Sequence, residues 1–249
     1  MNEQSYTGQV VSIGQRSLMP ITRETVNDKV YNELRRSLIH GVFATGETFR
    51  IAELAEKFQT STMPVRDALS RLVSEQALEA LPNRSVRVPL ISRERLEDLS
   101  RARFIIEGQV TLLAMDHLKS VDFKTLRQLT QDCEKSFVTR NPESIRIGIE
   151  LNHAFHYHIY RAAGSPVLIP VIESLWLQSG PYVQRSAFLH EEKQDPAGTH
   201  HHWELISALE RHDGDAAVAA LKNDISRAFN LIRAQLDLEE QQEDVAHEG

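Results

Sequence analysis

The hydrophobic pattern divides the chain into two parts. Between residues 20 and 91, three short helical stripes precede two apolar segments of strand length. After Ser92 the apolar residues recur at the three- and four-residue spacing of helices, and no further segment has the pattern of a strand. The pattern predicts a mainly α protein with four segments: a loose arm at 1–19, a mixed domain at 20–90, an all-helical bundle at 92–238 and an acidic, frayed tail at 239–249.

The centre of the first part is the segment 49–88. Leu54 and Phe58 give a short helix one apolar face, a polar break follows, and Pro64 lies near the start of a second helix, where its missing N–H costs nothing. Two short strands are then expected around a turn at 82–85. Two helices joined by a tight turn and followed by a hairpin form a winged helix-turn-helix, which places its second helix in the major groove of DNA.

Polar side chains of this unit are candidates for contact with DNA. Hydroxyls at the start of the second helix suit phosphate oxygens, and an arginine one turn further on can reach guanine or a phosphate. Arginines of the wing can reach the backbone or the minor groove. The alternative is that each arginine is solvated or paired with a nearby acid. The candidates are Arg50, Ser61, Thr62, Arg66, Arg84 and Arg87.

In the second part, caps and breaks predict where the helices begin and end. Ser92 can cap a long helix, and Asp122 and Asp215 can cap two later ones. A helix that starts near Pro166 is expected to be interrupted at residues 179–181, because the sequence there is Ser-Gly-Pro. These helices predict a bundle.

Charge is distributed unevenly along the 249 residues. Residues 20–91 carry 10 Lys and Arg against 9 Asp and Glu, whereas residues 92–249 carry 17 against 25, within a net charge of −7. The excess of acidic residues therefore lies in the second part of the chain, and the predicted DNA-binding domain has none. A weakly charged domain binds DNA modestly by itself, so we expect a homodimer on two half-sites.

Composition excludes a membrane protein and favours a reducing compartment. No apolar run approaches the roughly 20 residues that span a bilayer, and the N-terminus lacks the pattern of a signal peptide. Cys133 is the single cysteine, so no intrachain disulfide can form, which is consistent with the cytoplasm. Its helical spacing with apolar neighbours predicts a core residue and not a nucleophile.

Two motifs of the first part carry a family resemblance. The sequences STMPVRDALSRL at 61–72 and LPNRSVRV at 81–88 resemble the recognition helix and wing of the GntR family of bacterial transcription regulators. The resemblance covers residues 20–90. Thr62 stands where the family usually has Arg, and Ser85 where it usually has Gly, so the operator sequence does not carry over.

The second part, over about 95–235, resembles the FadR-type C-terminal domain (FCD) of the same family. Its R-x-x-x-E motif matches Arg103 and Glu107, and its D-x-x-F-H motif matches Asn152, Phe155 and His156. His202 and Asp224 match two later positions, but Asn152 replaces an Asp and Asp224 replaces a His. The resemblance implies a divalent metal ion inside the bundle that holds a small carboxylate effector.

The residue types can be weighed against that expectation. Asn152 and His156 are four residues apart and share one helix face. Two imidazoles, a carboxylate and an amide oxygen suit Zn, Ni or Mn. The predicted metal ligands are Asn152, His156, His202 and Asp224, and the predicted effector contacts are Arg103, Asn152, His156 and His202.

Simpler interpretations exist for the same residues. The two histidines could be hydrogen-bonded core residues of a metal-free pocket, and Arg103 could pair with Glu107 one turn on. The neighbouring histidines have the wrong helical phase and are expected at the surface: His153, His158, His200 and His201.

Together these features predict a transcription regulator, a repressor that binds a palindromic DNA operator as a homodimer and responds to a small organic acid. One alternative is a regulator whose effector is the metal ion itself. Another is a metal-dependent enzyme, but no nearby general base with a clear role is present in the sequence.

Overall fold

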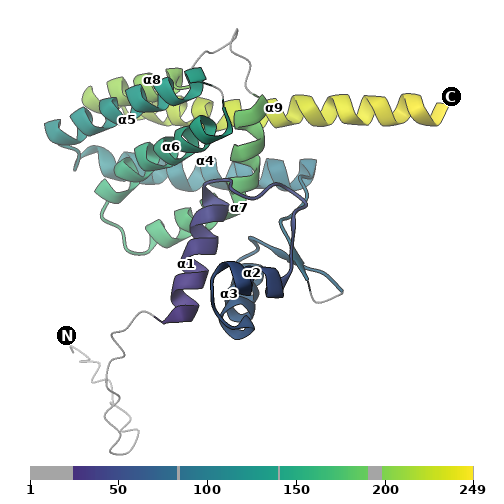
Figure 1. Cartoon of the computed structure of the whole chain (residues 1–249). Coiled ribbons are helices and arrows are strands. Elements are labelled where there is room, and N and C mark those ends of the chain that lie inside the picture. The colour runs from purple at the N-terminus through teal and green to yellow at the C-terminus, as the bar shows by residue number, and fades with distance from the viewer. Residues whose placement is uncertain (1–24, 83–84, 140, 190–197, 249) are drawn as a thin grey trace, which may run out of the picture.

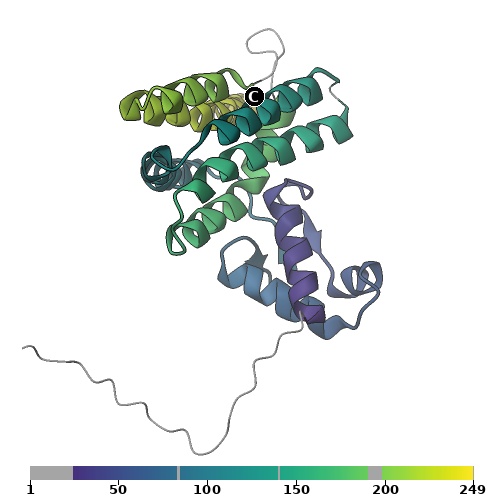
Figure 2. The ribbon, with the colours of Figure 1, turned by 90° about the vertical axis from the view of Figure 1, so that its left-hand side faces the viewer.

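The computed structural model describes residues 25–82, 85–139, 141–189 and 198–248. It is mainly helical and has two parts: a small domain that contains a short sheet, and a bundle of long helices (Figure 1). A side view shows the same two parts, with the small domain against one side of the bundle (Figure 2). The predicted fold class is confirmed, while the arm at 1–19 lies outside the described residues.

The small domain is a winged helix-turn-helix. Its antiparallel sheet has the strand order β1-β3-β2, with Phe49 opposite Val86 and Ala80 opposite the same residue. The third strand, β1, was not predicted, because its segment contains a glycine turn and too few residues to establish an alternating pattern. The elements are α1 (Val26–Ile39), β1 (Thr48–Phe49), α2 (Ile51–Lys57), α3 (Thr62–Ser74), β2 (Glu79–Ala80) and β3 (Val86–Arg87).

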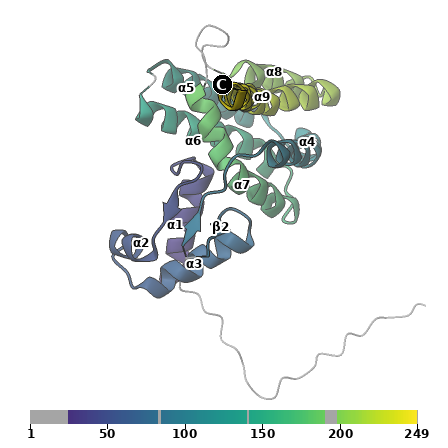
Figure 3. The same cartoon turned by 90° about the vertical axis from the view of Figure 1, so that its right-hand side faces the viewer.

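Local sequence explains the helix that opens this domain. The Thr25 hydroxyl accepts the backbone N–H of Asp28, whose carboxylate accepts the backbone N–H of Thr25, so α1 begins with a capping box. Val30, Leu34 and Leu38 lie on one face of α1 and are buried. That face packs mainly on α3, and α2 and α3 lie at the end of the domain that points away from the bundle (Figures 1 and 3).

The second part is an all-helical bundle. Its central side chains are fully buried and include Phe155, Tyr160, Trp176 and Phe229. The helices are α4 (Arg93–Met115), α5 (Ser120–Thr139), α6 (Pro142–Ala162), α7 (Leu168–Leu189), α8 (His200–Glu210) and α9 (Gly214–Glu248).

Three expectations about the bundle were wrong. Helix α7 runs through Ser179-Gly180-Pro181, because all three residues are buried and tertiary packing outweighs the lost backbone hydrogen bond. Asp122 lies within the first turn of α5 instead of capping it, and Asp213, not Asp215, accepts the N–H of Ala216 at the start of α9.

The C-terminal tail also differs from expectation. Helix α9 continues to Glu248 and extends beyond the bundle (Figure 1). Arg93 pairs with Asp237 and Glu240, which ties the first turn of α4 to this part of α9. Ion pairs with neighbouring helices therefore support a segment whose composition had suggested fraying.

Helix α7 joins the two hydrophobic cores. Trp176 belongs to the core of the bundle, and the next residue, Leu177, belongs to the core of the winged-helix domain. Gly180 lies directly against the backbone of α1, where an added Cβ would come within 1.9 Å of the Leu38 carbonyl oxygen. No helix among the described residues is long and apolar enough to cross a membrane.

Candidate DNA-binding surface and metal centre

The first two turns of α3 carry three of the predicted DNA contacts. Ser61 is the N-cap residue, and its hydroxyl makes no capping hydrogen bond to the described residues. Ser61, Thr62 and Arg66 are all exposed. Backbone N–H groups at a helix N-terminus attract phosphate, so this end of α3 combines donors with a cationic side chain.

The other predicted DNA contacts are arranged differently. Arg50 precedes α2 and pairs with Glu53 across a 3.1 Å N–O distance, with both side chains well exposed. Arg87 on β3 donates to Glu79 on the neighbouring strand β2 at 2.7 Å. A phosphate would have to compete with these carboxylates. Arg84 lies outside the described residues.

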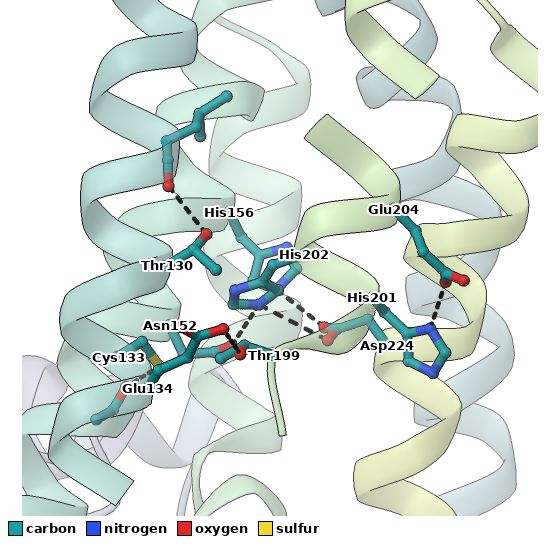
Figure 4. Close-up of polar contacts among 12 residues, drawn as sticks. Thr130, Cys133, Glu134, Asn152, His156, Thr199, His201, His202, Glu204 and Asp224 are labelled. Atoms are coloured by element: carbon teal, nitrogen blue, oxygen red, sulfur yellow. Dashed lines mark hydrogen bonds and ion pairs between the residues drawn. The ribbon is translucent and has the colours of Figure 1, made fainter. Parts of the chain in front are cut away.

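The predicted metal ligands converge from three helices. Asn152 and His156 come from α6, His202 from α8 and Asp224 from α9, and Figure 4 shows their polar ends directed at one another. The side chains of His156, His202 and Asp224 are 1%, 1% and 10% exposed. The sequence thus identified a set of residues that the fold brings together.

The distances within this set suit a common metal ion. The Nε2 atom of His156 lies 3.1 Å from Asp224 Oδ2, and the Nε2 atom of His202 lies 3.0 Å from Asn152 Oδ1 and 3.7 Å from Asp224 Oδ1. Two ligand atoms about 2.1 Å from one ion lie about 3.0–3.4 Å apart at octahedral or tetrahedral angles. His156, His202 and Asp224 therefore form a possible metal site, and Asn152 lies beside it.

The surroundings of His202 and Asp224 favour the protonation states that metal binding requires. Burial lowers the pKa of His202 to about 3, so its imidazole is neutral near pH 7. Burial alone would raise the pKa of Asp224, but a hydrogen bond from His156 and the positive charge of Arg227 hold it below its usual range. A neutral imidazole and an ionised carboxylate are the metal-binding forms.

The ring of His202 is held by packing as well as by hydrogen bonds. It stacks on Phe155 with 3.9 Å between ring centroids and 10° between planes. Its Nδ1 atom is buried and has no hydrogen-bond partner among the described residues. The orientation of the ring, with Nε2 toward Asn152 and Asp224, is therefore set by the Phe155 stack and by those two oxygens.

A buried polar chain extends from His156 to Arg103. The Tyr160 hydroxyl lies 3.4 Å from His156 Nδ1 and donates to Glu107 at 2.5 Å. Arg103 donates to both oxygens of Glu107, at 2.5 and 3.2 Å, and its guanidinium lies 4.4 Å from the centroid of the Trp176 ring. The pairing of Arg103 with Glu107, one of the two interpretations from sequence, is therefore present.

Arg103 nevertheless remains part of a cavity. The same cavity is bordered by three of the four candidate metal ligands, Asn152, His156 and Asp224, and by Trp176 and Thr199. Tyr160 was missed from the sequence, because an i,i+4 neighbour of His156 has no functional signature until Glu107 is known to face it.

The four neighbouring histidines do not behave alike. His153 is half-buried, stacked on Tyr157 at 4.1 Å and 5.1 Å from the ring of His40, which follows α1, and burial lowers its pKa to about 3. Its predicted surface position is therefore met only in part, because the ring of His40, the residue that follows α1, lies against it. His158 is half-buried and pairs with Asp122.

His200 and His201 lie on the outer side of α8. His200 Nε2 and His201 Nδ1 are 3.2 and 2.7 Å from the Glu204 carboxylate, and this exposed group is separate from the buried set. It provides a matched control for experiments on the buried residues.

These observations define the class of protein. A winged helix-turn-helix with an exposed recognition helix is joined to a helical bundle that contains a cluster of two imidazoles and a carboxylate, and His156 and Asp224 of this cluster border a cavity. Such a molecule combines a DNA-binding domain with a ligand-binding domain.

Comparison with known proteins identifies the family. Residues 26–88 match the model of the bacterial regulatory proteins of the gntR family, and residues 98–227 match the FCD domain. The chain belongs to the GntR family of bacterial regulators, in the group with an FCD domain. It is a DNA-binding transcription regulator and not an enzyme.

Individual relatives agree with this assignment. The chain is 31% identical over 211 residues to the HTH-type transcriptional regulator McbR of Escherichia coli K12, over 83% of this chain and 92% of the relative. It is 24% identical to the transcriptional repressor RspR of the same organism, over 84% and 90%. The solved structure of E. coli McbR/YncC superimposes with a TM-score of 0.78 at 26% identity, over 86% of this chain and 100% of that one.

Proposed function

We propose that the chain is a repressor that binds a roughly palindromic operator in double-stranded DNA as a homodimer. A small organic acid, held in the helical domain through a divalent metal ion, controls the affinity for the operator. The observation that supports the proposal is the cluster of His156, His202 and Asp224, two members of which, His156 and Asp224, border a cavity together with Arg103. Since RspR is named a transcriptional repressor, we expect this chain to repress transcription. It would bind its operator in the cytoplasm.

The chemistry of the donors supports a metal ion in this cluster. His156 and His202 would supply nitrogen ligands, Asp224 a carboxylate and Asn152 an amide oxygen. This mixture suits Zn, Ni or Mn. An amide oxygen is a weaker ligand than the carboxylate usual at position 152, so the affinity should be lower than in relatives with Asp.

The cavity supports an acidic effector beside the ion. A divalent ion with open positions binds carboxylate oxygens, and Arg103 adds a buried positive charge in the same cavity. Because Arg103 is already paired with Glu107, the effector would share the guanidinium with that residue. This arrangement favours a compact chelating acid.

Helix α7 connects the cavity to the DNA-binding domain. Trp176 lines the cavity and contacts Arg103, while Leu177 packs in the winged-helix core. Arg35 of α1 also pairs with Glu173 of α7 at 3.0 Å. A ligand that shifts Trp176 would move the surface on which α1 rests, and the geometry of two paired winged helices would change with it.

Sequence-specific contact is assigned to the N-terminal end of α3. Ser61 and Thr62 would bind phosphate oxygens and Arg66 a guanine edge or a phosphate. Arg50 and Arg87 are weaker contacts, because each already has a carboxylate partner. Arg84 remains a predicted wing contact.

Metal content of the purified, untagged protein tests the centre of the proposal. Wild type should contain about one first-row metal ion per chain, and His202→Ala should contain almost none. The double variant His200→Ala/His201→Ala removes the exposed imidazoles and should retain the ion. Equal metal in all three proteins, or loss only in the double variant, would contradict the buried site.

A second candidate differs only in the effector. The four ligand groups can be satisfied by an ion alone, without Arg103, so a metal-responsive regulator uses the same cluster. Operator binding measured with metal alone, and with metal plus citrate-like acids, separates the two. A response that requires the acid supports the organic-acid regulator, and a full response to metal alone supports the alternative.

A further inference from the structure

The recognition helix exposes one large hydrophobic side chain. Met63 is 59% exposed in the first turn of α3, whereas Val65, Leu69 and Leu72 of the same helix are buried in the domain core. The core therefore does not explain why position 63 is hydrophobic. Single exposed hydrophobic residues are ordinary on a protein surface, so the position of Met63 has to carry the argument.

The neighbours of Met63 on this face are polar. Arg66 and Asp67 follow at i+3 and i+4, are exposed and share its side of the helix. The Asp67 carboxylate accepts a hydrogen bond from the Asn27 side chain at 2.9 Å, which directs it toward α1. The N-terminal end of the recognition helix is the end that enters a groove of DNA. On this face of that end, Met63 and Arg66 are the two long side chains without a described partner.

The chemistry of the major groove offers an apolar partner at this position. Each thymine presents its C5 methyl group there, and apolar side chains recognise thymine through that methyl. Methionine is long and flexible, so it can follow the edge of a base pair. We propose that Met63 contacts a thymine methyl group in each half-site of the operator, an inference that rests on the DNA-binding function proposed above.

The spacing on the helix restricts where that thymine lies. Three residues of α-helix span about 4.5 Å, and successive base pairs are about 3.4 Å apart. The thymine read by Met63 therefore lies within about two base pairs of the base or phosphate contacted by Arg66. In this arrangement Met63 gives a preference for thymine, and Arg66 contributes a positive charge to the contact with DNA.

Uracil provides a direct test, because it keeps every hydrogen-bonding group of thymine and lacks only the methyl. The full-length protein is first used to select binding sequences from a random duplex library. Each thymine of the selected half-site is then replaced by uracil, and affinity is measured for wild type, Met63→Leu and Met63→Gln. Met63→Leu keeps an apolar side chain, and Met63→Gln has similar length but is polar.

At one thymine position, uracil in a single half-site should weaken binding of wild type and Met63→Leu by roughly fourfold, the effect of one methyl-sized group. Met63→Gln should bind the thymine and uracil duplexes equally. Equal loss in all three proteins at every thymine would overturn the inference while leaving sequence-specific binding intact. Failure to select any sequence would overturn the proposed function, and the inference with it.

Discussion

At the scale of single residues, the buried ion pair in α4 makes a strong prediction. Arg103 and Glu107 are 3% and 0% exposed. Replacing Arg103 by Met leaves the Glu107 carboxylate buried with only the Tyr160 hydroxyl as a donor. We expect a loss of roughly 3–5 kcal/mol in the free energy of unfolding, measured by urea denaturation.

The double variant Arg103→Met/Glu107→Leu is the control for that loss. It removes both charges, so most of the stability should return. If Arg103 also holds the effector, the double variant should fold normally and lose its response to the acid. A stable single variant would contradict the buried pair.

The thiol of Cys133 provides a second test at this scale. Burial raises its pKa to about 12, and the sulfur lies 3.5 Å from the Gly148 carbonyl oxygen. At pH 8 the group is therefore a protonated, inaccessible thiol and not a nucleophile. A disulfide reagent should react with less than about a tenth of it in the folded protein, and with one thiol per chain after denaturation. Rapid reaction of the folded protein would place Cys133 outside the core.

At the scale of elements, the contact of α1 with α7 depends on Gly180. A Cβ at this position would lie 1.9 Å from the Leu38 carbonyl oxygen, so Gly180→Ala must separate the two helices. We expect a loss of about 1–3 kcal/mol in unfolding free energy and a weaker effect of the effector on operator binding. Thermal denaturation and binding titrations with and without effector measure the two effects.

Gly108 in α4 is the matched control. A Cβ there would lie 3.6 Å from Val218 Cγ1, which is ordinary van der Waals contact. Since alanine favours a helix over glycine by roughly 0.5–1 kcal/mol, Gly108→Ala should be neutral or slightly stabilising. If Gly180→Ala and Gly108→Ala lose the same unfolding free energy, the close approach of Gly180 to α1 does not explain the loss.

The elements also differ in how well the sequence predicted them. The Ser92 cap is local and was predicted correctly, and the capping box at Thr25 is local as well. The strand β1 and the passage of α7 through Pro181 were not, because each depends on a distant partner. Thr48–Phe49 becomes a strand by pairing with β3, and α7 remains helical against α1.

At the scale of the whole molecule, the proposed homodimer needs a surface. Helix α4 lies at the edge of the bundle and exposes Ile105 and Leu113, two turns apart on one side (Figure 3). Burial of one such side chain contributes about 1.5–3 kcal/mol, so Ile105→Glu should raise the dimer dissociation constant about tenfold or more. Light scattering at several concentrations measures this, and operator affinity should fall in parallel.

Val138→Glu is the control for that change, because Val138 is 67% exposed on a different helix, α5. It should leave the dimer unchanged. If Ile105→Glu leaves the dimer dissociation constant unchanged, the dimer interface does not include this face of α4.

The sequence by itself determined the two domains, the recognition helix and the residues able to ligate a metal ion. Helical periodicity, helix caps and the residue types that bind metals can all be recognised from short stretches of sequence. The tertiary structure decided what those residues face. It brought His202 within hydrogen-bonding distance of Asn152 and His156 within that distance of Asp224, paired Arg103 with Glu107 and placed the ring of His40 against His153. These outcomes depend on contacts between helices far apart in the chain, and local patterns do not specify such contacts.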